Sequence, residues 1–506
     1  MPSTTFSAPG VRLRQLLPAV DIFGADDVLV QACSADSRTC REGDLFAALV
    51  GSDVDGHDYV SQAIANGATA ILAERYVPTA GVPVCIVPDA RAAFGQLCQA
   101  LSGNPTRRLK TIGVTGTNGK TSTCWLIASV LEAAGYRAGL TGTILNSDTQ
   151  AVESSEMTTP PAPALANWLA RMAANNCTHA VVEVSSHALA LSRTAGMEFD
   201  AACITNVRRD HLDFHNSLEN YRQAKAKLLK QLTPAGFAVL NADDAVSCKL
   251  LSQLDGAALT VGIENQAELT ATVVERQASE QTFLLHAGSE TAAVRTQVIG
   301  DGHVYNCLMA AAVGLLYGVK LTDIVRGLER LDKIPGRMER IECGQPFGVF
   351  VDYAHTPDAL ENSLRSLRAV TAGRLICVFG AGGERDREKR PLMAQAAEAF
   401  ADLAVVTDDN PRREDPNVIR RDIMRGFQQS SPVVMKSDRG DAIHWALGQA
   451  EPGDCVLIAG KGHEDYQSVG KVKHWFDDRE IARRWLYEHG VMPIEMLPAY
   501  RRARAG

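Results

Sequence analysis

The segment Thr111-Ile-Gly-Val-Thr-Gly-Thr-Asn-Gly-Lys-Thr-Ser-Thr123 joins a β-branched run, a glycine-rich turn and the start of a helix. In such an element the backbone N–H groups of the turn and the helix N-terminus favour a bound phosphate. Lys120 adds a positive charge, and the Thr121 hydroxyl can bind Mg²⁺. The segment therefore predicts an ATP site that is formed by Gly116, Thr117, Asn118, Gly119, Lys120, Thr121 and Ser122.

The spacing of the glycines differs from that of the common phosphate-binding loop. That loop has a glycine five positions before its Gly-Lys pair, where this chain has Val114, and the nearer glycine is Gly116. The pattern is a shortened variant, Gly-x-x-Gly-Lys-Thr. An ordinary glycine-rich turn is the alternative, and we favour ATP binding because a strand precedes the turn and a helix follows it.

Length and composition indicate a globular protein of several domains. The chain has 506 residues, too many for one core and enough for about three domains. The net charge of −8 argues against a nucleic-acid partner. The 12 Cys form no CxxC pairs, which favours free thiols in a reducing cytoplasm. Without an apolar span of about 20 residues or a secretory leader, we expect a cytoplasmic monomer that does not insert into membranes.

Residues 1–108 alternate between short strand and helix patterns, which predicts a small α/β domain. Strand-like runs cover 43–50, 70–73 and 84–87, and 59–66 is helix-like. Ser37 and Arg38 could hold a phosphate or a sugar, although a solvated turn is the simpler interpretation of these two residues alone.

Residues 109–336 predict a central ATPase domain with a mainly parallel sheet. Glu183 lies toward the end of the strand-like run 179–187, and His211 follows the run 201–206. Active-site groups of open parallel sheets lie at the carboxyl ends of strands, so both side chains are candidates. Further predicted elements are helices over 158–175, 218–232 and 304–316, and an antiparallel meander over 270–298.

Residues 337–506 predict a second doubly wound sheet, of the Rossmann-like type. Four apolar runs each end in a polar or glycine-rich loop, and a helix is predicted over 357–370. The runs cover 348–355, 375–380, 403–407 and 455–459.

Several motifs, taken together, resemble those of the Mur ligases, which are ATP-dependent amide-bond-forming enzymes of peptidoglycan synthesis. The motifs are Gly116-Thr-Asn-Gly-Lys-Thr121, Glu183-Val-Ser-Ser-His187, Thr205-Asn206, Asp210-His-Leu-Asp213 and Asp352-Tyr-Ala-His355. The resemblance covers the whole chain in order. It implies three α/β domains that bind the UDP-sugar (1–108), ATP (109–336, of P-loop type) and the incoming amino acid (337–506).

The resemblance also implies a mechanism. The substrate carboxylate attacks the γ-phosphorus of ATP to form an acyl phosphate, and cations must screen the two anions. Lys120 and Mg²⁺ would do so, and Glu183 is a suitable oxygen ligand for Mg²⁺. A second Mg²⁺ is implied near His211 and a carbamylated lysine, which matches Lys225. The implied catalytic set is Lys120, Glu183, His211 and Lys225, and the implied metal ligands are Thr121, Glu183, His211 and Lys225, the last as N6-carboxylysine.

From the residues alone, the roles of Lys225 and His211 would be assigned differently. A lysine on a helix, such as Lys225, is usually exposed. A single histidine such as His211 is more often structural, although its place at a strand end beside Asp210 favours a role in the site.

Other contacts are carried over from the family position by position. Asn306 resembles the residue that faces adenine, Arg337 an interdomain arginine that reaches phosphate, and Asp352 the ribose-binding carboxylate. His303 stands where the family often has a second asparagine, and Leu191 where close relatives can have a glutamine. The implied contacts to the UDP-sugar-peptide are Ser37, Ser52, Asp53, Val54, Thr158, Thr159, Ser185 and Arg193.

The motif Asp409-Asn410-Pro411-Arg412 indicates which amino acid is added. meso-Diaminopimelate has a second carboxylate that lysine lacks, and a guanidinium binds a carboxylate with two hydrogen bonds. The resemblance gives Arg412 this role, Arg390 the other carboxylate, and Gly460 and Glu464 the far ammonium group. A capped turn with solvated arginines is the alternative for this motif alone.

The sequence thus predicts a ligase that adds meso-diaminopimelate to UDP-N-acetylmuramoyl-L-alanyl-D-glutamate, with ATP as co-substrate and Mg²⁺ as cofactor. Two alternatives remain. One is the same chemistry on another substrate, either lysine addition or a folylpolyglutamate-type ligase, which the Asp409–Arg412 motif disfavours. The other is a nucleotide-dependent switch that hydrolyses ATP, which has no need of the second metal site implied at His211 and Lys225.

Overall fold

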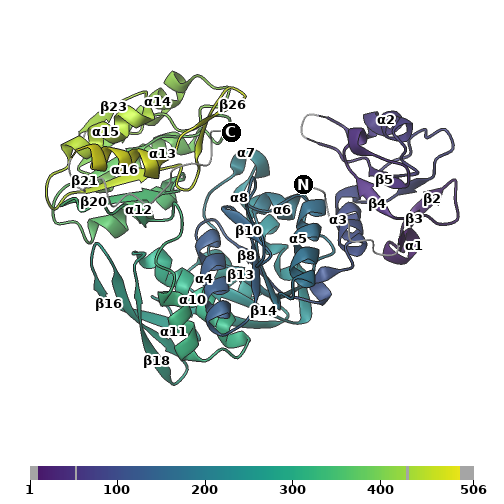
Figure 1. Ribbon diagram of the computed structural model, residues 1–506, viewed down its shortest axis with the longest axis horizontal. Helices are drawn as coiled ribbons and strands as arrows, with labels where there is room; N and C mark the ends of the chain where they lie inside the picture. The colour runs from purple at the N-terminus through teal and green to yellow at the C-terminus, as the bar shows by residue number, and fades with distance from the viewer. Residues whose placement is uncertain (1–9, 52–53, 429–431, 490–506) are drawn as a thin grey trace.

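The computed structural model describes residues 10–51, 54–428 and 432–489, and its secondary structure forms three α/β units that follow one another along the chain (Figure 1). Each unit has its own sheet. The central unit lies between the other two in Figure 1, with α3 of the first unit on one side and α12 of the third unit on the other. This arrangement confirms the predicted α/β class with mainly parallel sheets.

The first unit contains a five-stranded sheet in the order β2-β7-β6-β5-β4, with helix α3 (Ala90–Leu101) packed against it. Only the β2–β7 pair is antiparallel. The strands are β2 (Asp21–Phe23), β4 (Ala32–Ser34), β5 (Asp44–Ala47), β6 (Ala70–Ala73) and β7 (Val84–Ile86). Smaller elements are β1 (Val11–Arg12), α1 (Leu13–Leu16), β3 (Leu29–Val30), two 3-10 turns at Ser37–Thr39 and Gly56–Tyr59, and α2 (Val60–Ala65).

The central sheet has eleven strands in the order β11-β10-β9-β12-β8-β13-β14-β15-β16-β17-β18, parallel in the middle and antiparallel at both edges. The strands are β8 (Lys110–Thr115), β9 (Ala138–Thr141), β10 (Leu145–Ser147), β11 (Val152–Ser154), β12 (His179–Glu183), β13 (Phe199–Ile204), β14 (Leu232–Asn241), β15 (Ala257–Gly262), β16 (Leu269–Arg276), β17 (Gln281–Ala287) and β18 (Glu290–Thr296). The predicted meander is therefore present, as an extension of this sheet.

Helices cover the central sheet, and α4 and α10 contribute many residues to its main core. The α-helices of this unit are α4 (Lys120–Ala133), α5 (Ala162–Ala174), α6 (Ser186–Ala190), α7 (Leu212–His215), α8 (Leu218–Ala226), α9 (Ala245–Leu251), α10 (Asp301–Leu316) and α11 (Leu321–Glu329). Two 3-10 turns lie at Pro105–Arg107 and Leu229–Gln231.

The third sheet has the order β19-β20-β24-β21-β22-β23, and all pairs except β19–β20 are parallel. The strands are β19 (Glu339–Arg340), β20 (Gly348–Asp352), β21 (Leu375–Phe379), β22 (Leu403–Val406), β23 (Val433–Met435) and β24 (Cys455–Ala459), with a separate hairpin of β25 (Tyr466–Val469) and β26 (Val472–Trp475). Its helices are α12 (Pro357–Arg368), α13 (Lys389–Phe400), α14 (Pro416–Met424), α15 (Arg439–Gln449) and α16 (Asp478–Glu488).

Two predicted helices have different bounds in the structure, and proline explains the later start of the first. The helix predicted from residue 158 begins at Ala162, after Pro160 and Pro161. The helix predicted over 218–232 ends at Ala226, and a strand begins at Leu232, ahead of Pro234. A residue that precedes proline is disfavoured in the helical region, so Thr159 and Pro160 do not join α5, and Thr233 lies in β14.

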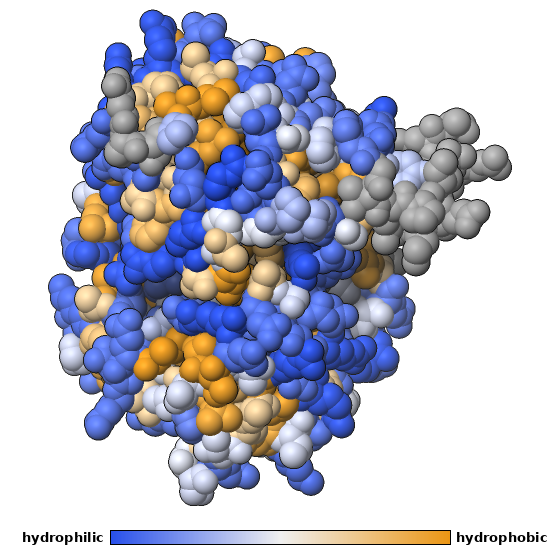
Figure 2. All heavy atoms as spheres, turned by 90° about the vertical axis from the view of Figure 1, so that its left-hand side faces the viewer, coloured by the Kyte–Doolittle hydropathy of each residue, from blue (hydrophilic) through white to orange (hydrophobic). Residues whose placement is uncertain are grey.

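In the part of the chain that the structure describes, every helix is too short or too polar to cross a bilayer. The face in Figure 2 is largely hydrophilic, with apolar residues in groups between the polar ones.

Candidate active site

The phosphate loop connects β8 to α4 and depends on two glycines. Gly119 has φ +84°, and a Cβ there would lie 2.3 Å from the Asn306 amide oxygen. A Cβ on Gly116 would lie 1.9 Å from the Thr205 hydroxyl. The loop therefore passes so close to α10 and to the end of β13 that only glycine fits at either position.

The loop uses some of its own polar groups internally. The N–H of Thr117 donates to the Asn206 carbonyl at 2.8 Å, and the N–H of Asn118 donates to the Asn206 amide oxygen at 3.0 Å. The first bond of helix α4 runs from Thr123 N–H to Gly119, which leaves the preceding N–H groups at the helix start outside the helical ladder. The backbone donors for an anion are thus those of Lys120, Thr121 and Ser122.

Glu183, at the end of β12, is only 1% exposed and is held by two threonines. The Thr121 hydroxyl donates to its Oε1 at 2.9 Å, and the Thr143 N–H donates to its Oε2 at 2.8 Å. The Thr143 hydroxyl lies 2.8 Å from Oε1 and 3.0 Å from the hydroxyl of Thr158. The carboxylate therefore lies directly beside the start of α4, as its strand-end position predicts.

Lys225 is buried rather than exposed, contrary to what a helix lysine alone would suggest. Its side chain is 1% exposed, and Nζ donates to the Gly116 carbonyl at 2.5 Å. Burial lowers the pKa of Lys225 well below its ordinary value, and the nearby charge of Lys120 adds to the effect. An unprotonated amine is the form of lysine that reacts as a nucleophile.

Lys120 and His211 are two further candidate catalytic residues near the phosphate loop. The ammonium of Lys120 donates to the Gly116 and Thr117 carbonyls at 3.0 and 2.8 Å. His211 has φ +52°, and its Nε2 lies 3.3 Å from Asp210 Oδ2. Burial lowers the pKa of His211 to about 3, although Asp210 acts in the opposite direction, so the imidazole is neutral. A neutral imidazole can ligate a metal ion.

The linker between the central and third units contributes an arginine to the phosphate loop. Arg337 Nη2 donates to the Thr121 hydroxyl at 3.1 Å, and its guanidinium lies 4.2 Å from the centre of the Tyr353 ring. The Nη1 atom of Arg337 is buried without a hydrogen-bond partner. The structure thus brings together residues that the resemblance assigned to one nucleotide site.

Asp352 differs from its expected role. Its carboxylate accepts hydrogen bonds from Met338 N–H at 2.6 Å, Ala354 N–H at 3.0 Å and the Ser363 hydroxyl at 3.0 Å. Burial is the main reason that the pKa of Asp352 is raised. In this conformation Asp352 therefore fixes the loop that carries Arg337 rather than presenting a free carboxylate to a ribose.

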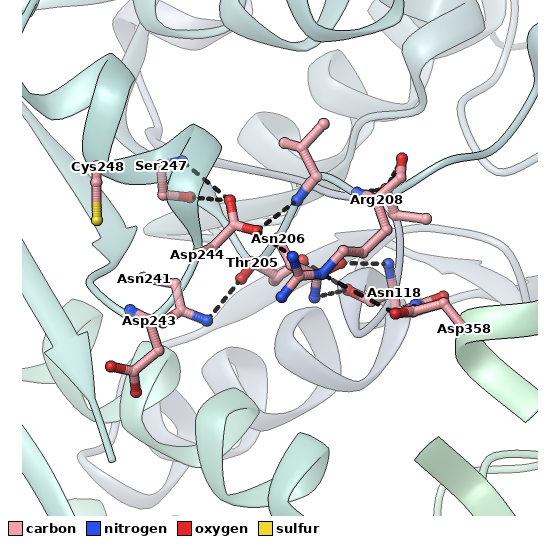
Figure 3. A network of polar contacts seen from close by, with 12 residues as sticks. Asn118, Thr205, Asn206, Arg208, Asn241, Asp243, Asp244, Ser247, Cys248 and Asp358 are labelled. Carbon is pink, nitrogen blue, oxygen red and sulfur yellow. Dashed lines mark hydrogen bonds and ion pairs between the residues drawn. The ribbon is translucent and has the colours of Figure 1, made fainter. Parts of the chain in front are cut away.

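A polar network joins the phosphate loop to the third unit (Figure 3). The Asn118 amide donates to Asp358 Oδ2 at 2.7 Å, at the start of α12. Arg208 lies 4.0 Å from the same carboxylate and 3.8 Å from Asp244. Nearby, Arg209 pairs with Glu388 and lies 3.8 Å from Asp386, just before α13. The loops that follow β8 and β13 therefore both contact the third unit.

The predicted amino-acid residues gather at the carboxyl ends of β22 and β24. The amide of Asn410 donates to Glu464 at 2.8 Å, and Lys461 Nζ lies 3.2 Å from both residues. Gly460 has φ +119°, and a Cβ there would lie 2.5 Å from Asp409 Oδ2. Burial and the neighbouring Asp409 raise the pKa of Glu464. These four side chains and one glycine form a buried polar cluster.

The two arginines assigned to diaminopimelate differ in their surroundings. Arg412 has φ +52° and is half-buried, and its Nη1 donates to the Gly383 carbonyl at 2.7 Å. Its remaining guanidinium N–H groups are not used in any hydrogen bond among the described residues. Arg390 is fully buried and its Nη2 and Nη1 donate to Glu414 and Asp422 at 2.7 and 3.0 Å. Arg390, unlike Arg412, is thus already paired with carboxylates of this chain.

A cavity of about 680 Å³ lies between the first and central units. It is lined by Arg193, one of the predicted sugar contacts, and by Leu191, together with Arg41 and Arg91. Arg193 Nη1 donates to the Thr159 carbonyl at 2.8 Å. The Thr159 hydroxyl in turn donates to the Glu183 carbonyl at 2.8 Å and accepts from Ser185 N–H at 2.9 Å. This chain of contacts links the cavity to the phosphate loop.

Two other predicted sugar contacts, Ser37 and Val54, are not among the described residues that line this cavity. Ser37 is buried, and its hydroxyl donates to Gln62 at 2.7 Å. Its neighbours Asp36 and Thr39 line the cavity instead. Val54 is 55% exposed, and Ser52 and Asp53 lie outside the described residues.

Sequence reasoning missed several residues of the site. Thr143 follows β9, so the rule of strand carboxyl ends would have identified it. Lys461 lies between Gly460 and Glu464, which were both assigned to the amino acid, but it received no role. Arg439, whose guanidinium pairs with Asp478 at 2.7 Å with both side chains fully buried, gave no signal because helix arginines are usually solvated.

Three family models match the chain, and together they span most of it. They are described as "Mur ligase family, catalytic domain" over residues 29–101, "Mur ligase middle domain" over 114–314, and "Mur ligase, glutamate ligase domain" over 336–462.

Curated relatives match over nearly their full length. A protein of Geobacillus thermodenitrificans named UDP-N-acetylmuramoyl-L-alanyl-D-glutamate–2,6-diaminopimelate ligase is 43% identical over 92% of this chain and 97% of its own. A Bacillus cereus protein of the same name is 41% identical over 90% and 93%. A solved structure with that name covers 95% of this chain and 99% of its own, at 33% identity and a TM-score of 0.68. With identities of this size over three matching units, the chain belongs to the Mur ligase family.

Proposed function

We propose that this protein is an ATP-dependent ligase that joins meso-2,6-diaminopimelate to UDP-N-acetylmuramoyl-L-alanyl-D-glutamate. The observation that carries the proposal is the convergence on Thr121. Glu183 from the central sheet and Arg337 from the next unit both contact its hydroxyl, at 2.9 and 3.1 Å. Relatives at about 42% identity over most of the chain bear the name of this activity.

The reaction has two steps that the residues can support. In the first, a carboxylate oxygen of the D-glutamyl group attacks the γ-phosphorus of ATP, and ADP leaves. In the second, the amine of diaminopimelate attacks the acyl carbon, phosphate leaves and the amine loses its proton. Lys120 and Arg337 offset the repulsion between the two anions of the first step, and they act more strongly in a site that excludes water.

The residues beside the loop fit a magnesium ion. Thr121 and Glu183 supply two oxygen atoms 2.9 Å apart, and Mg²⁺ in nucleotide sites usually takes one or two protein oxygens together with water and phosphate. Bound there, the ion would neutralise charge on the transferred phosphoryl group. Thr143 also holds the Glu183 carboxylate, through its N–H and its hydroxyl.

Lys225 is suited to carbamylation, because burial favours the neutral form of its amine, which can attack carbon dioxide with loss of one proton. The product is a carboxylate-like group on a side chain that now donates to Gly116 and lies 4.6 Å from the Tyr221 ring centre. Such a group would be an oxygen ligand for a second metal ion beside His211. We therefore assign Lys225 a metal-binding role in its modified form.

Arg412 would select diaminopimelate by its second carboxylate. Its guanidinium is anchored through Nη1 only, and the strained αL backbone directs the side chain toward Gly383. Glu464 and Asp409 are the carboxylates that would bind the ammonium group at the far end of diaminopimelate. Arg390 would act indirectly in this conformation, by fixing Glu414 two residues after Arg412.

Phosphate release measured with each substrate omitted in turn tests the proposal. We expect release only when ATP, the UDP-sugar dipeptide and meso-diaminopimelate are all present, with much slower release when L-lysine replaces diaminopimelate. Release at the full rate without an amino acid would indicate an ATPase, and an equal rate with lysine would remove the assigned substrate.

A further inference from the structure

We propose that Cys33 and Cys98 form a redox-modification site in the wall of the 680 Å³ cavity, where a hydroperoxide oxidises the two thiols to a disulfide and weakens nucleotide-sugar binding. The link to nucleotide-sugar binding rests on the function proposed above. Formation of the disulfide does not depend on it.

The two thiols are close and come from different elements. Their Sγ atoms are 3.8 Å apart, Cys33 on β4 and Cys98 on α3, and both are free. Cys33 is half-buried and lines the cavity, whereas Cys98 is 3% exposed. A small oxidant that enters the cavity therefore reaches Cys33 first, and the second thiol lies directly behind it.

The two cysteines lie on the two elements that form walls of the cavity, β4 and α3. Arg91, Phe94 and Cys98 are spaced by three and four residues on α3, so they lie along one face of the helix. Arg91 and Phe94 line the cavity on that side, and residues 32–34 of β4 line it on the other. A bond between Cys33 and Cys98 would therefore fix one wall against the other.

The bond requires a change in shape. A disulfide has its sulfur atoms about 2.0 Å apart, so atoms that are now 3.8 Å apart must approach by roughly 1.8 Å. Rotation of the two side chains and movement of α3 toward β4 can both supply this approach. Any such movement of α3 shifts Arg91 and Phe94, which lie on this helix and line the cavity.

The chemistry balances with a hydroperoxide as the oxidant. The Cys33 sulfur attacks the O–O bond and becomes a sulfenic acid, while the alcohol or water leaves. The Cys98 sulfur then displaces water from the sulfenic acid to form the disulfide. The Cys98 thiol loses its proton in this second step, and the water that leaves carries it away. The contact with Cys33, and then burial, raise the pKa of Cys98, which slows this step.

The first test is chemical and needs no activity. The full-length protein is treated with hydrogen peroxide, and peptides are mapped under non-reducing conditions. We expect a cross-linked pair that contains Cys33 and Cys98, absent from Cys33→Ser and Cys98→Ala and removed by dithiothreitol. The exposed Cys248 provides the matched control, since Cys248→Ser should leave the cross-link unchanged. Oxidation of Cys33 only to sulfinic acid, without a cross-link, would overturn the proposal.

The second test measures binding with UDP as the probe. Oxidation should raise the Kd for UDP by about tenfold, comparable to the loss of roughly one hydrogen bond, and reduction should reverse it. Saturating UDP should also slow the oxidation of Cys33. A cross-linked protein with unchanged Kd would contradict the functional part. Failure of the ligase proposal would appear separately, as a reduced protein that binds UDP but forms no amide.

Discussion

The guanidinium of Arg337 donates a hydrogen bond to the Thr121 hydroxyl at 3.1 Å, which links the start of the third unit to the phosphate loop of the second. The Thr121 hydroxyl in turn donates a hydrogen bond to Glu183 at 2.9 Å. Because Asp352 fixes the backbone next to Arg337, the position of the arginine depends on the third unit. The geometry thus makes nucleotide binding sensitive to how these two units meet.

Replacing Arg337 by Ala should lower kcat/KM for ATP by about 10- to 100-fold, the range for a lost hydrogen bond to a charged group. Arg337→Lys should recover part of the loss, because it restores the charge without the planar fork. Steady-state kinetics with saturating co-substrates measure the effect. Arg340, which is partly exposed and pairs with Glu342, is a matched control, and an equal loss in Arg340→Ala would show that the effect is not specific.

Lys225→Ala should abolish most of the activity, because the proposed second metal site requires a carbamate on this buried amine. Short carboxylic acids added to the assay should restore part of it, by occupying the space of the missing group. Intact mass measured at high bicarbonate provides a second readout, with an added carbon dioxide mass expected in the wild type. A fully active Lys225→Ala variant would remove the carbamate from the mechanism. Lys227→Ala, two positions further along the chain, is the control.

Arg412→Ala should cost about 2–5 kcal/mol in the selectivity for diaminopimelate over lysine, as expected for removal of one partner of a desolvated charge pair. The comparison of kcat/KM for the two amino acids measures this difference directly. Arg413→Ala, the adjacent arginine, is the control and should leave the ratio unchanged. An unchanged kcat/KM for diaminopimelate in Arg412→Ala would exclude the assigned role.

The Arg390–Glu414 pair should make stability depend on pH in the acid range. The hydrogen bond from Arg390 is the main reason that the pKa of Glu414 falls to about 2. Since this pKa is lower in the folded state, the stabilisation is complete above the ordinary glutamate pKa of about 4.3 and is lost as the pH falls toward 2. Denaturant unfolding of Glu414→Gln should show a smaller decrease between pH 5 and 3 than the wild type. An identical pH dependence would contradict this account.

Much of the architecture could be predicted because its signals are local. The apolar runs around Ile112 and Val405 and the turn at Gly119 each determine one element from a few residues. The order of strands is different, since nothing near β8 in the sequence indicates that β12 and β13 flank it. Sequence patterns thus identify single strands and helices more readily than they identify which strands pair in a sheet.

The site was predictable to a similar degree. Glu183 and Asn410 lie at strand ends, where the fold rule places active groups, and both are in the polar clusters of the structure. The side-chain partners could not be foreseen, because they come from distant segments. The side chains of Asp352 and Arg390 lie in the units that the sequence predicted for them, but they already form hydrogen bonds with other groups of this chain. The burial of Lys225 likewise follows from the packing of α8 under the loop and not from its own sequence.

The central claim is that the phosphate loop at Thr121 and the segment Asp409–Arg412 act together to form an amide through an acyl phosphate. An isotope-transfer measurement tests this claim most directly. The D-glutamyl carboxylate of the UDP-sugar dipeptide is labelled with ¹⁸O, and the phosphate released during ligation of diaminopimelate is analysed by mass spectrometry. The mechanism predicts one labelled oxygen in each phosphate released. Unlabelled phosphate, released at the rate of amide formation, would contradict it.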